Sequence, residues 1–263
     1  MRLYPESAMD FKHANDTDRG ASRPRENVLY VGLPGQPSPS RLPGCSLPPM
    51  KWGRIHPRNF YARPVLDVAR ELLGSLLIRQ APDGLVLAGR LVEVEAYLGD
   101  GSDPSAHSHR GPTRRNKSMF GPPGHLYAYS IYGIHTCINL VCEPRGVGSA
   151  ILIRAIEPLM GIDRMRANRG LESAARGPLI ASGPGRLSQA FGFSLDDDGR
   201  PLNRSDLCIR APGAWDRPLC MVQGPRIGIS KAVQLPYRFY AEDDAWVSRV
   251  RKSKRVSEKT LEA

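Results

Sequence analysis

The segment of residues 91–97, Leu-Val-Glu-Val-Glu-Ala-Tyr, constrains the fold most, because apolar and polar side chains alternate along it. Successive side chains of a β-strand point to opposite faces of the sheet. One face would hold Val92, Val94 and Ala96, and the other would hold Leu91, Glu93, Glu95 and Tyr97. The segment therefore predicts a strand that seals a core with one face. The polar face suits an enzyme that activates water beside a flat, electron-poor substrate, although a half-exposed strand with a solvated face is the alternative.

The chain has 263 residues, of which 41% are hydrophobic, enough for one folded domain with a tail at each end. Residues 1–50 contain eight Pro and no periodicity, which predicts a disordered leader, or an extension before a true start at Met50. We expect the folded domain to span residues 51–250 and residues 251–263 to form a basic disordered tail.

Several classes of protein lose support from what the sequence lacks. No apolar run is long enough to cross a bilayer and no secretory signal is present, which predicts an intracellular protein. The five Cys are irregularly spaced, which favours reduced thiols over zinc or disulfide sites. Walker, G-x-G-x-x-G, G-x-S-x-G and H-E-x-x-H motifs are missing. Acyl transfer, NTP hydrolysis and dinucleotide redox chemistry therefore lose support, and we expect no cofactor and no metal.

The net charge of +11 indicates the class of partner. Residues 51–248 hold 25 basic and 19 acidic side chains, and residues 249–263 hold six basic and two acidic ones. A basic body with a basic tail fits a polyanion such as nucleic acid, whereas an ordinary soluble protein of high pI is the alternative.

The pattern of the domain predicts an α+β fold with a curved, mostly antiparallel sheet, a protruding β-hairpin and surrounding helices. We expect helices over residues 64–73, 158–167 and 182–191, the last with Ser182 as its N-cap. We expect strands over residues 75–80, 85–97, 126–131, 134–141 and 149–156, and short strands around 219–230, 236–240 and 245–250.

The loop of residues 99–124 carries imidazoles next to basic side chains. His107 and His109 could form a metal pair, but a pair without a third ligand is a weak metal signal. Arg110, Arg114, Arg115 and Lys117 fit contacts with backbone phosphates better, the alternative being a solvated basic surface.

The predicted hairpin is rich in aromatic residues. Tyr127 and Tyr129 share one face, and Tyr132 lies near the tip, where a bulky side chain could wedge between base pairs. On the returning strand, a buried Asn139 would need a partner for its amide, either in the protein or on a polar substrate edge.

Two further features carry charge. Arg154 is a lone cation in an apolar strand and needs an anionic partner, with Glu95 and Glu157 as the candidates. Ser182, Gly183 and Arg186 lie at a predicted helix start, which is either a phosphate seat or an ordinary cap.

At this point the chain resembles the 3-methyladenine (alkyladenine) DNA glycosylases, of the mammalian alkyladenine glycosylase type. The matching stretches are RLVEVEAYLG (90–99), AHS (106–108), TRRN (113–116), MF (119–120), GHLYAYSIYG (124–133), CIN (137–139), ILIRAIEPL (151–159), SGP (182–184) and WVS (246–248). They run in family order over roughly three-quarters of the chain. Two positions depart from the mammalian pattern: Ile134 replaces a Met and His135 replaces a Tyr.

The resemblance implies a role for each matching residue. It implies that Glu95 is the general base that activates water and that Arg154 helps to hold that water. It implies that Tyr97, His107 and Tyr129 enclose a base flipped out of the duplex. Asn139 would discriminate against the amino group of guanine, and Tyr132 would fill the gap in the duplex. Glu93 receives no role from the matching motifs.

The implied activity is the release of alkylated purines from double-stranded DNA by a monomer without a cofactor. Such an enzyme would act in the cytoplasm or nucleoid of a bacterium, or in the nucleus of a eukaryote. No Lys lies in the matching strands, so a monofunctional enzyme that leaves an abasic site is expected. A catalytically silent damage-binding module and a glycosylase with lyase activity are the alternatives. Whether the substrates extend from 3-methyladenine to hypoxanthine, 7-methylguanine and ethenoadenine stays open.

Overall fold

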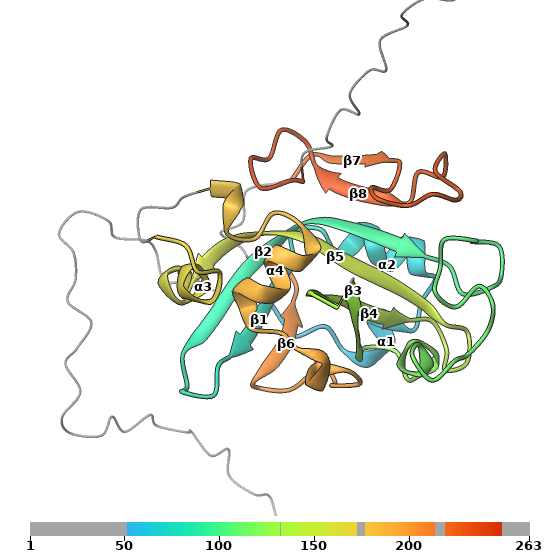
Figure 1. Cartoon of the computed structure of the whole chain (residues 1–263), viewed down its shortest axis with the longest axis horizontal. Helices are drawn as coiled ribbons and strands as arrows, with labels where there is room; N and C mark the ends of the chain where they lie inside the picture. Colours follow the sequence, from blue (N-terminus) through green and yellow to red (C-terminus); the bar gives the residue numbers. More distant parts are fainter. Residues whose placement is uncertain (1–51, 132, 173–176, 214–218, 249–263) are drawn as a thin grey trace, which may run out of the picture. The chain divides into compact units, whose positions relative to one another are not determined.

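The computed structural model of the chain describes residues 52–131, 133–172, 177–213 and 219–248 (Figure 1). The strands are β1 (Leu76–Gln80), β2 (Val86–Tyr97), β3 (Leu126–Ile131), β4 (His135–Cys142), β5 (Ser149–Met160), β6 (Leu207–Arg210), β7 (Met221–Gly224) and β8 (Arg238–Ala241). The helices are α1 (Arg58–Tyr61), α2 (Val65–Leu72), α3 (Ile162–Asn168) and α4 (Pro184–Phe191), with 3-10 helices η1 (Lys117–Phe120), η2 (Gly177–Leu179) and η3 (Leu195–Asp197). The expected leader of residues 1–50 and tail of residues 251–263 lie outside the described residues.

The described strands form one antiparallel sheet in the order β3-β4-β5-β2-β1-β6, and β8 pairs with both β2 and β7. Strand β2 is central: its first half lies between β1 and β5, and its second half lies between β5 and β8. Register shifts between β2 and β5 near Gly89 and Glu93 mark bulges, which bend a strand and increase its twist. The curled antiparallel sheet with few helices confirms the predicted α+β class.

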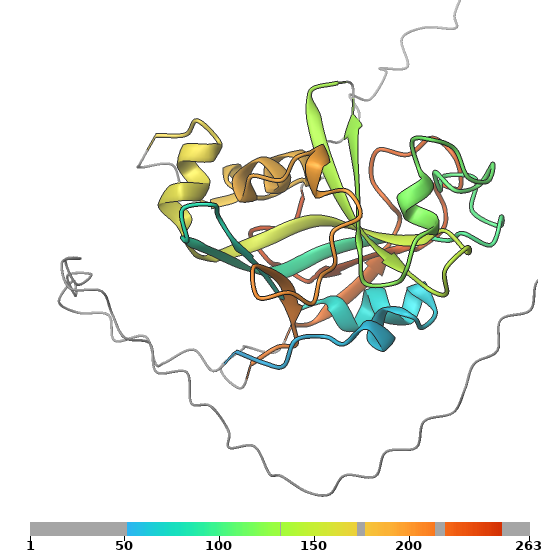
Figure 2. The same ribbon diagram turned by 90° about the horizontal axis from the view of Figure 1, so that it is seen from below.

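Helices cover the sheet from two sides, as Figure 2 shows, with α2 on one side of the long strands and α4 and the β3–β4 hairpin on the other. Helix α2 buries Val65, Val68, Ala69 and Leu72, whose spacing gives it one apolar face. This face packs on β2 and β5, and α4 packs on β4 and β5. The helices therefore hold in place the two long strands, β2 and β5, that carry several of the expected site residues.

The structure corrects the predicted end of β5. The Glu157-Pro158 pair was expected to end the strand, but β5 continues to Met160 and α3 begins only at Ile162. Strand β4 pairs with β5 only as far as Leu152, so Pro158 lies beyond this pairing, at an edge of β5. A Pro is tolerated there because no neighbouring strand among the described residues needs the N–H that it lacks.

Two smaller predictions are also wrong, and one strand was not predicted. Ser182 is not the N-cap of α4, because Gly183 takes that position and no side chain caps the helix. Residues 245–248 form turns rather than a strand. Strand β6 was not predicted, because its four residues are too short for a clear alternation.

Candidate active site

The polar face of β2 is buried rather than solvated. The side chains of Glu93 and Glu95 are both 0% exposed, which excludes the alternative of a half-exposed strand with a solvated face. Part of the cover comes from the segment around Ile227, which lies more than 130 residues further along the chain. Two buried carboxylates on one strand face are costly unless charged or polar partners surround them.

Glu95 has a partner for each of its oxygens. Its Oε1 accepts a hydrogen bond from the backbone N–H of Ile227 at 2.7 Å. Its Oε2 accepts one from the Tyr97 hydroxyl at 2.9 Å and one from Nη1 of Arg154 at 3.2 Å. Burial, and then the charge of Glu95, raise the pKa of Tyr97 well above 10, so its hydroxyl stays a donor. The carboxylate is thus held in a fixed orientation.

Arg154 joins the two carboxylates of β2. Its Nε lies 3.2 Å from Oε1 of Glu93, and its Nη1 lies 3.2 Å from Oε2 of Glu95. Although burial opposes it, the charges of Glu95 and Glu93 raise the pKa of Arg154. Glu95 is therefore confirmed as a partner, whereas Glu157, the alternative, forms an ion pair with Arg90 instead.

Glu93, which had no assigned role, anchors three parts of the chain. Besides Arg154, it accepts hydrogen bonds from Nε of Arg238 at 2.6 Å and from the backbone N–H of Ser248 at 2.8 Å. Glu93 therefore has a structural role: it binds Arg154, Arg238 and the backbone of Ser248.

The turn found where a strand was predicted is closed by Asp244, whose Oδ1 accepts a hydrogen bond from the N–H of Trp246 at 2.9 Å and whose carbonyl oxygen accepts one from the N–H of Val247 at 3.2 Å.

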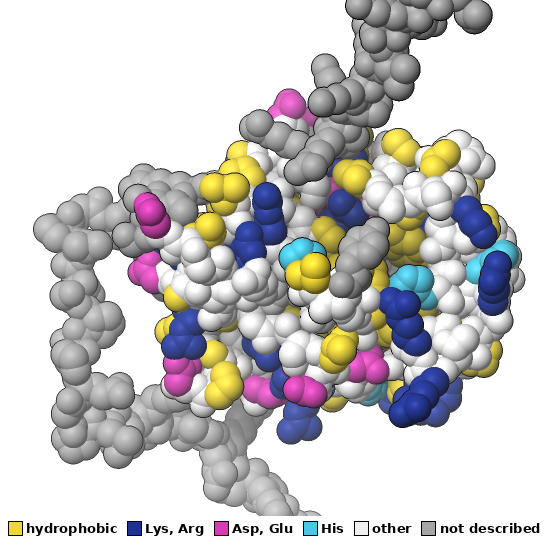
Figure 3. All heavy atoms as spheres, in the orientation of Figure 1, with side chains coloured by type: hydrophobic (Ala, Val, Ile, Leu, Met, Phe, Trp, Pro, Cys, Tyr) yellow, Lys and Arg dark blue, Asp and Glu magenta, His cyan; other side chains and the backbone are white. Residues whose placement is uncertain are grey.

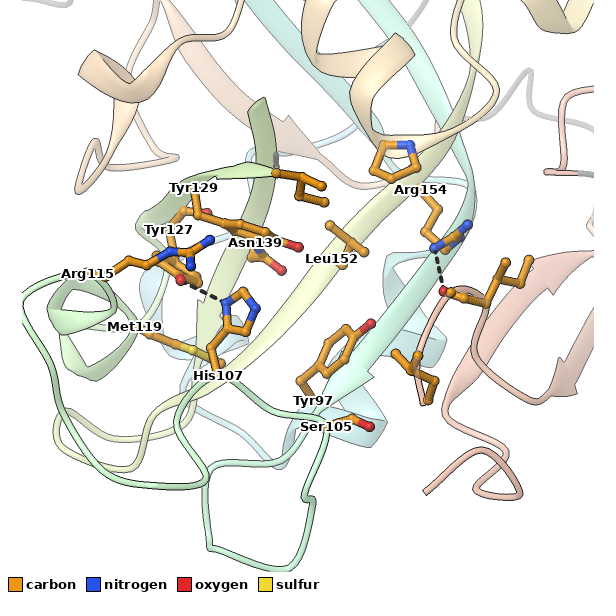
Figure 4. A pocket seen from close by; sticks show the side chains of 15 residues that line it. Tyr97, Ser105, His107, Arg115, Met119, Tyr127, Tyr129, Asn139, Leu152 and Arg154 are labelled. Carbon is orange, nitrogen blue, oxygen red and sulfur yellow. Dashed lines mark hydrogen bonds between the residues drawn. The ribbon is translucent and has the colours of Figure 1, made fainter. Parts of the chain in front are cut away.

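A pocket of about 640 Å³ opens in front of these groups (Figure 4). It is lined by Tyr97, Ser105, His107, Arg115, Met119, Tyr127, Tyr129, Ile131, Asn139, Leu152, Arg154, Pro184, Ile227, Gly228 and Ile229. Three of these residues, Tyr97, Arg154 and Ile227, donate the hydrogen bonds that hold Glu95. The volume suits a small aromatic ligand, and mainly apolar and aromatic walls are typical of such sites.

The aromatic wall of the pocket is a linked set. Nδ1 of His107 lies 2.9 Å from the hydroxyl of Tyr127, and the His107 ring meets Tyr129 edge-on with centroids 4.6 Å apart. Tyr127 stacks on Tyr129 at 5.4 Å, as expected for two residues on one strand face. Partial burial, and then the charge of Arg115, lower the pKa of His107, which favours a neutral ring at pH 7. In Figure 4, Tyr97 lies across the hollow from His107 and Tyr129.

Asn139 is buried on the pocket wall, and its amide is paired as its burial requires. Its Nδ2 donates a hydrogen bond to the carbonyl oxygen of Tyr127 at 3.1 Å. This bond fixes the orientation of the amide, so its oxygen and its remaining N–H have defined directions.

A second hollow of about 260 Å³ adjoins the pocket and shares His107, Arg115 and Tyr127 with it. Its other walls include His109, Arg110 and Lys231. Figure 3 shows Lys, Arg and His side chains gathered on this side of the molecule, over the loop between β2 and β3. Arg114 is exposed but lines neither hollow.

The remaining predicted DNA contacts are less directly connected to the pocket. Arg186 is exposed on α4. The N–H groups of Ser182 and Gly183 are already donated, to the carbonyls of Pro178 and Arg154 respectively. Tyr132 lies outside the described residues.

Sequence reasoning missed one buried ion pair beside the pocket. Arg226 donates two hydrogen bonds to Asp103, and both side chains are 0% exposed. One signal was present, because Arg226 precedes Ile-Gly-Ile and has no charged neighbour within four residues on either side. Asp103, in a polar loop, gave no such signal.

Two kinds of feature are absent from the described residues. No group of three or more His, Cys, Asp or Glu side chains lies close enough to hold a metal ion. No described helix is both long and apolar enough to span a bilayer.

Comparisons with known proteins agree with the geometry. Residues 59–245 match the model of the family described as methylpurine-DNA glycosylase. A protein of the archaeon Methanoculleus marisnigri named "Putative 3-methyladenine DNA glycosylase" is 48% identical over 196 residues, covering 73% of this chain and 98% of that protein. Proteins of the same name from Rhodopseudomonas palustris CGA009 (45% identical; 75% and 89% covered) and Nitrosospira multiformis (47%; 70% and 89%) are similar.

The family match covers well over half of the chain, and the relatives are microbial rather than mammalian. The chain belongs to the methylpurine-DNA glycosylase family, a family of DNA repair hydrolases that act on N-glycosyl bonds.

Proposed function

We propose that the chain flips alkylated purines, 3-methyladenine among them, out of double-stranded DNA and hydrolyses their N-glycosidic bonds as a monofunctional glycosylase. One observation carries the proposal: Glu95 is held by three groups that all line an aromatic pocket. A base cannot be reached inside the duplex, so a pocket of this kind needs an extruded nucleotide. The resemblance to the mammalian alkyladenine glycosylases implies the same division of roles.

Glu95 is the general base of the proposed reaction. Its carboxylate takes a proton from a water molecule, which attacks the anomeric carbon of the sugar as the bond to the purine breaks. The sugar passes through an oxocarbenium-like state, which the nearby negative charge stabilises. Arg154 holds the water and the carboxylate, and its second partner Glu93 fixes its position.

The pocket favours a positively charged base. A 3-alkylated adenine is cationic, and it is attracted to the electron-rich faces of Tyr97 and Tyr129. A neutral His107 adds a ring without adding a repelling charge, in line with its lowered pKa. The fixed amide of Asn139 discriminates against the exocyclic amino group of guanine.

Basic side chains at the pocket mouth bind the DNA backbone. Arg110, Arg115 and Lys231 surround a hollow beside the base pocket, where a phosphate would meet several cations. Arg114 and, on α4, Arg186 extend this surface with exposed side chains. The N–H groups of Ser182 and Gly183 already bond to carbonyl oxygens of the chain, so they are not proposed as a phosphate seat. Tyr132 is the wedge; in the sequence it comes two residues before Ile134, which is 78% exposed. The enzyme acts as a monomer, inside the cell at the chromosome.

The reaction ends with an abasic site. A lyase step would need an amine to attack the sugar, and no Lys is among the described residues that line the base pocket. The pocket therefore supports hydrolysis by water alone.

The test is to incubate the protein with duplexes that each carry one lesion and to measure the abasic sites formed. The lesions are 3-methyladenine, 7-methylguanine, hypoxanthine and ethenoadenine. Release of 3-methyladenine is expected. Tight binding of damaged duplexes without any base release would instead indicate a damage-binding module, and a DNA adduct trapped by borohydride would indicate a lyase.

A further inference from the structure

We propose that Asp103 and Arg226 form a positioning pair, which holds Glu95, Tyr97 and His107 in the arrangement that base excision needs. The inference rests on the proposed function and adds two residues to it. Neither of them lines the base pocket, so they act through the residues that do.

The pair has the geometry of a rigid clamp. Nη1 of Arg226 lies 2.5 Å from Oδ2 of Asp103, and Nη2 lies 2.8 Å from Oδ1. Two parallel bonds between a guanidinium and a carboxylate fix their relative orientation as well as their distance. Nη1 of Arg226 also donates to the carbonyl oxygen of Ala96 at 3.0 Å, which ties the clamp to β2.

Arg226 acts on Tyr97 by stacking. Its guanidinium carbon lies 4.6 Å from the centre of the Tyr97 ring and 5.4 Å from that of Tyr237. A guanidinium held by Asp103 therefore supports the Tyr97 ring that lines the base pocket.

Arg226 acts on Glu95 through the next residue of the chain. The N–H that bonds to Oε1 of Glu95 at 2.7 Å belongs to Ile227, and the peptide unit that carries it joins Arg226 to Ile227. A side chain fixed at Arg226 thus limits where this N–H points.

Asp103 acts on His107 through the loop between β2 and β3. Its carboxylate accepts hydrogen bonds from the backbone N–H groups of Leu98 at 3.3 Å and Ser105 at 3.0 Å. Its carbonyl oxygen accepts one from Ala106 at 3.0 Å, directly before His107. The clamp therefore links the loop that carries His107 to the segment that carries Ile227.

A contribution to the stability of the fold does not by itself explain why this ion pair is present. A buried ion pair pays a large desolvation penalty and is often no better for stability than packed apolar side chains. Here the pair contacts the groups that support Glu95, Tyr97 and His107. This location suits a role in positioning these three residues.

The test is Arg226→Lys, which keeps the charge but loses the parallel bonds and the flat stacking surface. Circular dichroism first establishes that the variant is folded, and two quantities are then measured. One is the single-turnover rate of base release from methylated duplex DNA with protein in excess. The other is the Kd for a duplex with a tetrahydrofuran abasic analogue. We expect the rate to fall about 100-fold, as a misplaced group can cause, with little change in Kd.

The matched control is Arg79→Lys. Arg79 pairs with Asp197 at 2.8 Å and lies 4.3 Å over the ring of Phe193, so it makes the same kinds of contact away from the pocket. This control should keep the wild-type rate. Asp103→Asn serves as a second variant of similar size and should lose rate as Arg226→Lys does.

Folded Arg226→Lys or Asp103→Asn with the wild-type rate would overturn the proposal, whatever the change in melting temperature. An equal loss of rate in Arg79→Lys would overturn it as well. A wild-type protein that releases no base would instead refute the proposed function, which separates the two failures.

Discussion

The guanidinium Nη1 of Arg154 lies 3.2 Å from Oε2 of Glu95, with both side chains buried on neighbouring strands of the sheet. The same guanidinium reaches Glu93 through Nε. One permanently charged guanidinium therefore pairs with two carboxylates. Its removal would leave both carboxylates buried with fewer hydrogen-bond donors.

Arg154→Gln should lower the free energy of unfolding by about 3–5 kcal/mol, the usual cost of breaking a buried ion pair. Urea denaturation measures this change. The control is Arg63→Gln, whose ion pair with Glu71 is exposed and should contribute about 0–1 kcal/mol. Equal effects of the two substitutions would show that Arg154 is not paired as described.

Glu93→Gln separates the two carboxylates of β2. Of the three donors to Glu93 only Arg154 lines the pocket, whereas all three donors to Glu95 do, so this variant should keep measurable base release. It should lose about 1–3 kcal/mol of stability, because an amide cannot accept from all three of its donors. Complete loss of base release in a folded Glu93→Gln protein would give Glu93 a direct chemical role.

The sequence was sufficient for the elements with strong periodicity. The alternation over residues 91–97 predicted β2 and the shared face of Glu93 and Glu95, and the aromatic pattern predicted the hairpin with Tyr127 and Tyr129. A lone cation in an apolar strand correctly indicated that Arg154 needs a carboxylate. These are local patterns that each element shows by itself.

The features that were missed depend on contacts between distant parts of the chain. Alternation could not show that the polar face of β2 is buried, because part of the cover comes from the segment around Ile227. The backbone N–H of Ser248, which was expected in a last strand, bonds instead to Glu93. Asp103 had no local signal, since only the fold brings it to Arg226.

His107 should titrate below its ordinary pKa of 6.5, because burial and the charge of Arg115 disfavour the protonated ring. An NMR titration of the ring protons measures the midpoint. Arg115→Gln removes the second cause and should move the midpoint upward, while Lys117→Gln, on the same loop, should leave it unchanged. A midpoint at or above 6.5 in the wild type would argue against a neutral His107 at the pocket.

His56 should make stability depend on pH. Burial lowers its pKa from 6.5 to about 4, and its Nε2 lies 3.0 Å from the hydroxyl of Ser75. Between these values the unfolded chain binds a proton that the folded protein does not, so stability falls as pH drops from 6.5 towards 4. The loss is at most about 3 kcal/mol. His56→Gln should lose less stability across this range, and an equal loss would show that His56 is not responsible.

The central claim is that Glu95 activates the water that releases the base, and Glu95→Gln tests it most directly. An amide cannot take a proton from water, so single-turnover base release from methylated duplex DNA should fall by about 10²–10⁴-fold. The Kd for an abasic-analogue duplex should stay close to the wild-type value. The control is Glu157→Gln, which lies outside the pocket and pairs with Arg90. A folded Glu95→Gln protein that releases bases at the wild-type rate would contradict the account.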